Sequence, residues 1–562
     1  MKHARYNGWL RKKGGTCFDK LTMNGIISNI SSPSPFVLSL SKDSERVFHQ
    51  PARFVTIVCL TLIGAAPLWA QSMSARAILD QATKAMGGTA ALRAIKNQIV
   101  ESEGKQFDSS STPKPLGPTR QISTFRYTLT RDFAQPKLKL DWDSRNTARN
   151  ESIRFVEVID GDIGGLQEGD PKNAKQSRLH PGRLATRMRE EKRVPIKLLL
   201  AASAQKNLKR LADAEIGGVK HAVVSFKDGG DEFHVYFDPK THLPSQVDIL
   251  DYDPLEGDSS YLVRYADWRK VDGVMTPFSL RYELNGKALQ EEQIKSVKNN
   301  AALAAEVFTV AESARNQKTD AAPIPSQWIL RRVAGNVSYL DFGRPPSVQW
   351  NRLADGVHKL QGVGHATIVV EMKDHLVVVE GPLYEERAAP VVKSIQEKFP
   401  NKPIRYAVPT HHHLDHAGGI RAMMASGAAI VTPFSAKEFY TQVARSSHSR
   451  RPDSLEKNKT GAVIESFGGG PRILTDGARR VEVYPLPTSH AEDLVVIYLP
   501  GEKILIEADH ISPRNGQVRG APLVKEFLSA LDKLNLDVST IVGIHGDSAT
   551  LQAARAAAQG TK

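Results

Sequence analysis

One decapeptide, residues 410–419 with the sequence THHHLDHAGG, limits the possible folds of this chain more than any other segment. Four potential metal ligands fall within six residues of it: His411, His413, Asp415 and His416. Zinc sites are built from imidazole nitrogens and carboxylate oxygens, and a catalytic zinc keeps one position open for water. The alternation of the first two histidines puts both imidazoles on one side of an extended strand end. The other two ligands follow as the chain turns and can face a second ion. The alternative is a histidine-rich surface loop that picks up metal adventitiously.

Short apolar runs surround this motif in an order typical of an α/β fold. Residues 404–408 predict a buried strand directly before it, and Gly418 and Gly419 let the backbone turn tightly into a helix. Further strands are predicted at residues 357–360, 366–371, 376–380, 429–433, 481–486, 494–499 and 503–507, with an amphipathic helix at 385–399. Strands with interleaved helices predict sheets covered by helices, an α/β layered domain.

Three more candidate ligands follow predicted strands further along the chain. His490 lies in the segment PTSHAED, Asp509 follows the apolar run 504–508, and His545 lies in IVGIHG. Each of them alone is more often a hydrogen-bonded residue at a strand end than a ligand. Their order and spacing after the first motif favour the ligand interpretation.

Residues 348–550 resemble the metallo-β-lactamase superfamily of hydrolases, because every expected ligand position of that family is filled. The resemblance implies a four-layer αββα sandwich with two zinc ions, iron or manganese being alternative metals. By this resemblance, the first ion is bound by His411, His413 and His490, and the second by Asp415, His416 and His545. Asp509 bridges both ions. Aspartate at position 509 is similar to the glyoxalase II thioesterase and lactonase branches, whereas β-lactamases of this fold typically carry Cys or Ser there.

The activity implied by this resemblance is hydrolysis of an ester, thioester, lactone or amide by a metal-bridging hydroxide. Asp415 is the candidate catalytic residue, which accepts a hydrogen bond from the attacking hydroxide and carries its proton onward. Glu380 departs from the family pattern, which usually has Asp at this position. That Asp supports the metal ligands by hydrogen bonding without binding the metal itself. A mono-iron dioxygenase of the same fold is the alternative enzyme. His413 argues against the di-iron, oxygen-reducing branch, which places Glu at that position.

Residues 75–310 are predicted to form a separate α+β domain. Strand-like alternations dominate, and residues 184–211 predict a helix broken at Pro195. The segments 236–244 and 265–277, followed by Asn299-Asn300 and Phe308, resemble the lipoprotein-carrier-like half-barrel proteins of bacterial envelopes. That resemblance implies a curved antiparallel sheet over a hydrophobic cavity for an acyl chain or other apolar ligand. A structural or dimerisation domain, and a non-enzymatic envelope carrier, remain alternatives.

The N-terminal 70 residues predict export. The apolar run 54–70 follows Arg46 and Arg53 and ends with Pro67 and the small Ala70, as in a signal peptide at 51–70. An uncleaved anchor is the alternative, but the run is short for a membrane span. Residues 1–50 are then a disordered leader ahead of the true start, and the mature protein is periplasmic or secreted.

The net charge limits the classes of binding partner, and the cysteine content limits the types of metal ligand. The formal net charge of +14 contains no long basic run, which argues against nucleic acid and favours a small-molecule substrate, anionic or acylated. The basic run 445–451 and Arg514 and Arg519 are candidates to receive it, although such a run is more often a solvated surface. Both cysteines, Cys17 and Cys59, precede the predicted cleavage site, so His and carboxylates must supply any metal ligands.

Residues 311–327 are predicted to form a linker between the two domains, and residues 328–562 are predicted to form the second domain.

Overall fold

The computed structural model describes residues 73–147, 151–169, 175–335, 342–345, 347–362, 365–515, 517–518 and 522–559. The predicted leader 1–50 and signal peptide 51–70 therefore lie outside the described residues. The described chain belongs to one unit, Ser72–Lys562. Among the residues that are described, none of the helices combines the length and the apolar character needed to cross a membrane.

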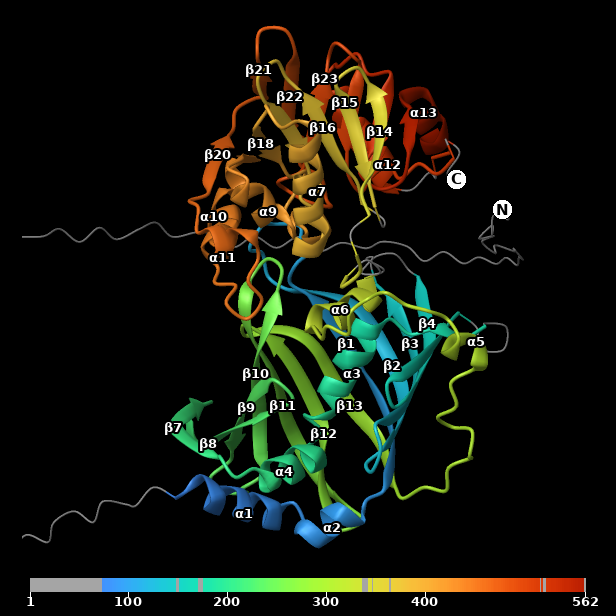
Figure 1. The fold of residues 1–562 in the computed structure, drawn as a ribbon. Coiled ribbons are helices and arrows are strands. Elements are labelled where there is room, and N and C mark those ends of the chain that lie inside the picture. Colours follow the sequence, from blue (N-terminus) through green and yellow to red (C-terminus); the bar gives the residue numbers. More distant parts are fainter. Residues whose placement is uncertain are drawn as a thin grey trace, which may run out of the picture. The chain divides into compact units, whose positions relative to one another are not determined.

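The first half of the described chain is a single antiparallel sheet. Its strands are β1 (Asn97–Asp108), β2 (Arg120–Asp132), β3 (Lys137–Asn146), β4 (Ser152–Asp160), β5 (Ile163–Glu168), β6 (Ser177–Arg178), β7 (Lys209–Ile216), β8 (Val219–Asp228), β9 (Asp231–Phe237), β10 (Pro244–Asp253), β11 (Gly257–Val271), β12 (Val274–Leu284) and β13 (Lys287–Asn299). Their order is β6-β5-β4-β3-β2-β1-β13-β12-β11-β10-β9-β8-β7. Figure 1 shows this sheet curving around α3, which agrees with the predicted half-barrel.

Two-residue turns join the strands where the sequence has the appropriate residues. Asp272-Gly273 connects β11 to β12 and Asn285-Gly286 connects β12 to β13, all four residues having positive φ. Such turns match the right-handed twist of the flanking strands and so fix the register of each hairpin. The segment 265–277 is therefore a hairpin.

The helices of this half are α1 (Ala75–Ala85), α2 (Thr89–Ala94), α3 (Pro181–Glu191), α4 (Pro195–Ala204), α5 (Glu312–Arg315) and α6 (Gln327–Gly335). Pro195 separates α3 from α4, as the predicted break requires, but the prediction of helix as far as Leu211 is wrong. Leu211 lies in β7 and pairs with Val223, because sheet pairing overrides the helical pattern there. Residues 311–327, predicted as a linker, contain α5 and are tied to the half-barrel, where the Gln327 backbone amide donates to Asp251 Oδ2 at 3.0 Å.

A cavity of about 180 Å³ lies in the half-barrel. Its lining combines stacked aromatic rings, such as Trp142 and Phe155, with buried charged groups, such as Glu191 and Arg193. The cavity is therefore more polar than the hydrophobic one implied by the carrier family.

The second half has two sheets. The first contains β14 (Gln349–Ala354), β15 (Val357–Gln361), β16 (Thr367–Glu371), β17 (Leu376–Val379), β18 (Ile404–Val408), β19 (Ala429–Pro433) and β20 (Val463–Phe467). The second contains β21 (Arg472–Thr475), β22 (Arg480–Pro485), β23 (Val495–Leu499), β24 (Ile504–Glu507), β25 (Thr540–Gly543) and β26 (Ser548–Thr550). The helices are α7 (Glu385–Lys398), α8 (Leu414–Ala417), α9 (Ile420–Ala425), α10 (Lys437–Arg445), α11 (Ser454–Asn458), α12 (Pro522–Asp532) and α13 (Leu551–Gln559), with a 3₁₀ turn η1 (Phe434–Ala436).

Three hydrophobic clusters show how these elements stack. Val370 and Val377 of the first sheet pack with Val483 and Ile506 of the second in a shared core. A second cluster joins the first sheet to α7, α9 and α10, and a third joins the second sheet to α12 and α13. The four layers confirm the predicted αββα sandwich. Residues that follow β17, β18, β24 and β25 leave the carboxyl ends of strands, where ligands bind in α/β folds.

Candidate metal centre

The predicted motif comprises most of the loop after β18, the short helix α8 and the two glycines that follow it, and close backbone packing fixes its path. Gly418 and Gly419 end the motif, and an added Cβ would lie 2.1 Å from Leu383 O and 2.4 Å from the Ala388 Cβ, respectively. The glycines are therefore required for the close approach of this turn to its neighbours, whereas their negative φ values are accessible to other residues. His411 and His413 are buried, each with 2% or less of its surface exposed.

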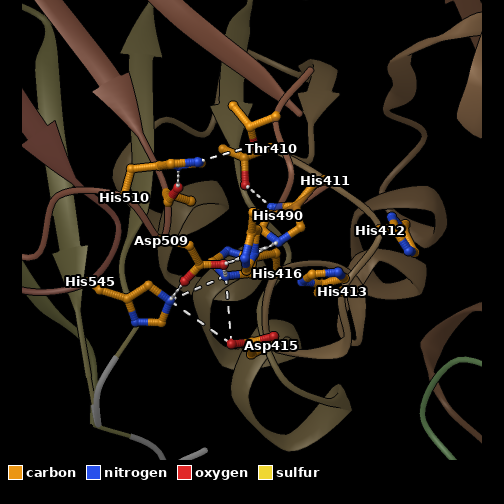
Figure 2. A network of polar contacts seen from close by, with 12 residues as sticks. Thr410, His411, His412, His413, Asp415, His416, His490, Asp509, His510 and His545 are labelled. Atoms are coloured by element: carbon orange, nitrogen blue, oxygen red, sulfur yellow. Dashed lines mark hydrogen bonds and ion pairs between the residues drawn. The ribbon is translucent and has the colours of Figure 1, made fainter. Parts of the chain in front are cut away.

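The structure brings all seven predicted ligands together in two groups that share Asp509. His411, His413, His490 and Asp509 form one group, and Asp415, His416, Asp509 and His545 form the other. Within each group the candidate ligand atoms lie within 4.8 Å of one another. Figure 2 shows Asp509 between the two groups of rings.

Asp509 contacts both groups through its two carboxylate oxygens. Its Oδ2 lies 3.1 Å from His411 Nε2, 2.9 Å from His490 Nε2 and 3.0 Å from His416 Nε2. Its Oδ1 lies 2.8 Å from His545 Nε2. The backbone of Asp509 has a φ of 72°, a strained conformation of the kind that concentrates at functional sites. This residue therefore has the position of a bridging ligand.

The surroundings of the histidines fit a divalent metal. His411 Nδ1 lies 3.1 Å from Thr410 Oγ1, His416 Nδ1 donates to Glu380 at 3.1 Å, and His413 Nε2 donates to a backbone carbonyl at 2.9 Å. In each ring one nitrogen makes a polar contact with a neighbouring group, and the other nitrogen remains available to bind a metal. The inner nitrogens approach one another closely, with 3.3 Å between the Nε2 atoms of His490 and His411. An all-imidazole and carboxylate donor set suits zinc, iron and manganese.

Electrostatics support the same conclusion. Burial, followed by the neighbouring imidazoles, holds the pKa values of His411 and His413 well below the usual range, so both rings are neutral as metal ligands must be. Burial acts to raise the pKa of Asp509, but His416 and the other histidines hold that pKa well below its usual range. Burial acts to lower the pKa of His416, but Asp509 and Glu380 raise it well above its usual value. The carboxylates of Asp509 and Glu380 therefore stabilise positive charge next to His416. A divalent cation can supply this positive charge in place of a proton.

The model of the metallo-beta-lactamase superfamily matches residues 360–545. This part of the chain is a metallo-β-lactamase domain. Among solved structures, the domain is similar to a metallo-beta-lactamase from Pontibacter korlensis at 18% identity, covering 38% of this chain and 100% of that chain with a TM-score of 0.30. It is also similar to a flavodiiron protein from Giardia intestinalis at 18% identity, covering 38% of this chain and 59% of that chain with a TM-score of 0.28.

A curated relative is the 2,4-dinitroanisole O-demethylase subunit alpha of Nocardioides sp. strain JS1661. It is 27% identical over 161 residues, which are 28% of this chain. The match spans 43% of that relative, less than half of its length.

Glu380 contacts a predicted ligand of the metallo-β-lactamase domain on the side away from the other ligands, in the supporting position expected from the sequence. It directly follows β17, is fully buried, and has a φ of 80°. Its Oε1 accepts a hydrogen bond from the Thr410 backbone amide at 3.0 Å, and its Oε2 accepts one from His416 Nδ1 at 3.1 Å. The glutamate therefore connects the end of β17 both to the motif backbone and to one predicted ligand.

Replacing Glu380 by Gln is expected to weaken zinc binding about 10–100-fold, the usual effect of removing an outer partner of a metal ligand. A glutamine amide group offers one acceptor oxygen where the carboxylate offers two, so either the Thr410 amide or His416 Nδ1 faces another donor. The measurement is competition for zinc with a chromophoric chelator. Glu397→Gln, the same change at an exposed site on α7, is the matched control. Equal affinity in the two variants would contradict the role of Glu380.

His365 is a residue of the centre that the sequence patterns did not single out. It is 5% exposed, its Nε2 lies 3.6 Å from Asp415 Oδ2, and its ring centroid lies 4.4 Å from that of His545. Burial, followed by His545, lowers the pKa of His365 to about 4, which keeps its ring neutral. Its position just after β15 was a usable signal, since the other candidates also follow strands.

His412, the middle residue of the histidine run, lies outside both ligand groups. Its Nδ1 lies 2.6 Å from Asp493 Oδ1, and Figure 2 shows its ring apart from the cluster around Asp509. This contact joins the motif loop to the loop that carries His490. The role of His412 is therefore structural.

The basic run 445–451 is engaged in ion pairs. Arg450 Nη2 lies 2.6 Å from Asp231 Oδ1 in the half-barrel, and Arg451 pairs with Glu386. These contacts favour a structural role over substrate binding. Arg514 is exposed, and Arg519 lies outside the described residues.

Proposed function

We propose that this protein is an exported, dinuclear zinc hydrolase that cleaves an ester, thioester, lactone or amide. The observation that carries the proposal is the sharing of Asp509 between two complete groups of ligand-capable residues. A mono-iron dioxygenase needs one such group, so the second group favours two ions over one.

Two bound divalent ions would supply Lewis acidity and lower the pKa of a water toward ~7. His411, His413, His490 and Asp509 would hold one ion, and Asp415, His416, His545 and Asp509 the other. Burial acts to raise the pKa of Asp415, yet His416 and His365 hold it well below its usual range. Asp415 is therefore ionised, and its carboxylate can accept a proton from an attacking nucleophile.

We infer a small anionic or acylated substrate and a periplasmic or secreted location, both from the sequence. The O-demethylase relative supports a second candidate reaction, removal of a methyl group from an aryl methyl ether. The half-barrel cavity supports a bound apolar or amphipathic ligand, since its aromatic lining offers stacking surfaces beside the buried charges.

Metal analysis of the purified chain, followed by a substrate panel, tests this proposal. Two zinc ions per chain are expected, with turnover of at least one ester, thioester, lactone or amide that stops when a chelator removes the metal. The panel includes 2,4-dinitroanisole as the aryl methyl ether. A single iron per chain with oxygen consumption would contradict the proposal in favour of the dioxygenase.

A further inference from the structure

A loop of the half-barrel reaches the metal centre. It comprises residues 109–119 and connects β1 to β2, and its carbonyls accept hydrogen bonds from two ligand-bearing segments of the metallo-β-lactamase domain, the motif and the loop that carries His490. The Ser110 carbonyl accepts from the Leu414 amide at 3.1 Å, and the Pro113 carbonyl accepts from the Glu492 amide at 2.8 Å. Between them, the Thr112 carbonyl accepts from His413 Nε2 at 2.9 Å. Thr112 is 1% exposed, so this contact is shielded from water.

The β1–β2 loop is held in shape before it meets the motif. Asp108 Oδ1 accepts hydrogen bonds from the Ser110 amide at 2.8 Å and from Ser110 Oγ at 2.7 Å. Thr112 Oγ1 donates to the Lys114 carbonyl at 2.7 Å, and the Gly117 amide donates to the same carbonyl at 2.9 Å. A loop fixed in this way presents its carbonyls at defined positions, which lowers the entropic cost of holding a ligand ring.

The contact determines which nitrogen of His413 is available to a metal. A carbonyl oxygen only accepts hydrogen bonds, so the proton of the neutral ring lies on Nε2. Nδ1 is then the nitrogen with a free lone pair. The ring lies beside its partners in the first group, with centroids 4.4 Å from His411 and 4.6 Å from His490.

We propose that the β1–β2 loop is a positioning element of the metal centre, through which the half-barrel fixes the tautomer and orientation of His413. The inference rests on the proposed function, since it concerns the affinity of that centre for zinc. The strands beside this loop also line the half-barrel cavity through Gln106, Asp108 and Ile122, so the loop adjoins both the cavity and the metal centre. All seven predicted ligands come from the second half of the chain, and the first half supplies the carbonyl that orients one of them.

Two variants of the full chain test this role. In the first, Asn-Gly replaces residues 109–119, because Asp108 and Arg120 are register partners that a two-residue turn can join. In the second, Asp108→Ala removes the acceptor that shapes the loop and keeps its length, so it tests the contact even if the replacement does not fold. Asp238→Ala is the control. Asp238 accepts from the amides of Lys240 and Thr241 in a similar turn between β9 and β10.

The readouts are zinc titration against a competing chelator and amide hydrogen exchange of the peptide that contains Leu414. The loop replacement is expected to weaken binding of one of the two zinc ions about 10–100-fold and to accelerate exchange at Leu414. Asp108→Ala is expected to change both in the same direction, and Asp238→Ala neither. Equal zinc affinity in all chains overturns the inference alone. Absence of zinc binding by the intact chain overturns the proposed function as well.

Discussion

Replacing Asp509 by Ala is expected to abolish the proposed hydrolysis and to remove metal from both ligand groups. Asp509 contacts predicted ligands of both groups within 3.1 Å, so its loss leaves two incomplete donor sets. Each Lewis acid contributes several kcal/mol to transition-state stabilisation, which corresponds to a loss of about 10³-fold or more in kcat/KM. Metal content by elemental analysis and kcat/KM on the best substrate of the panel measure the two effects.

Asp355→Ala is the matched control for Asp509, because the Asp355 side chain is 95% exposed and pairs only at the surface with Arg352. It is expected to keep both metal ions and full activity. Asp509→Asn separates charge from shape, since the amide preserves the side-chain volume but bridges two cations poorly. Retention of two zinc ions in Asp509→Ala would refute the bridging role.

Replacing Glu157 by Ala is expected to destabilise the half-barrel by about 3–5 kcal/mol, the cost of breaking a buried ion pair from one side. Glu157 lies on β4 with no exposed surface, and its carboxylate pairs with Arg183 and Arg187 of α3. Burial acts to raise the pKa of Glu157, but the two arginines hold it below its usual value, so the carboxylate is charged. Its removal leaves the buried Arg183 without this counterion. Urea unfolding followed by circular dichroism measures the shift.

An exposed ion pair of the same sheet provides the control. Arg126 and Asp143 pair on neighbouring strands with side chains 78% and 33% exposed. Asp143→Ala is therefore expected to cost at most about 1 kcal/mol. A shift for Glu157→Ala no larger than that of Asp143→Ala would show that the buried cluster contributes little to stability.

The predictions that succeeded rest on short-range patterns. The apolar runs around residues 357–507 predicted the strands of the sandwich, because buried strands require continuous apolar segments. The Asp-Gly and Asn-Gly dipeptides are a further short-range pattern, which no prediction used: both lie at hairpins of the half-barrel, because positive φ is accessible to these residues. The failure at Leu211 has the opposite cause, since pairing with Val223 is a contact that no local pattern records.

By itself, the sequence determined the seven candidate ligands, because their residue types and their order along the chain match the ligand pattern of the metallo-β-lactamase superfamily. Only the tertiary structure decided how the ligands are supported. The Thr112 carbonyl contacts His413, which lies 301 residues further along the chain, and His365 Nε2 lies 3.6 Å from Asp415 Oδ2. A backbone carbonyl has no residue-type signature, and a buried histidine gains its role from its neighbours. The Thr112 contact therefore exists only once the half-barrel and the sandwich have folded against each other, and the His365 contact only once the sandwich itself has folded.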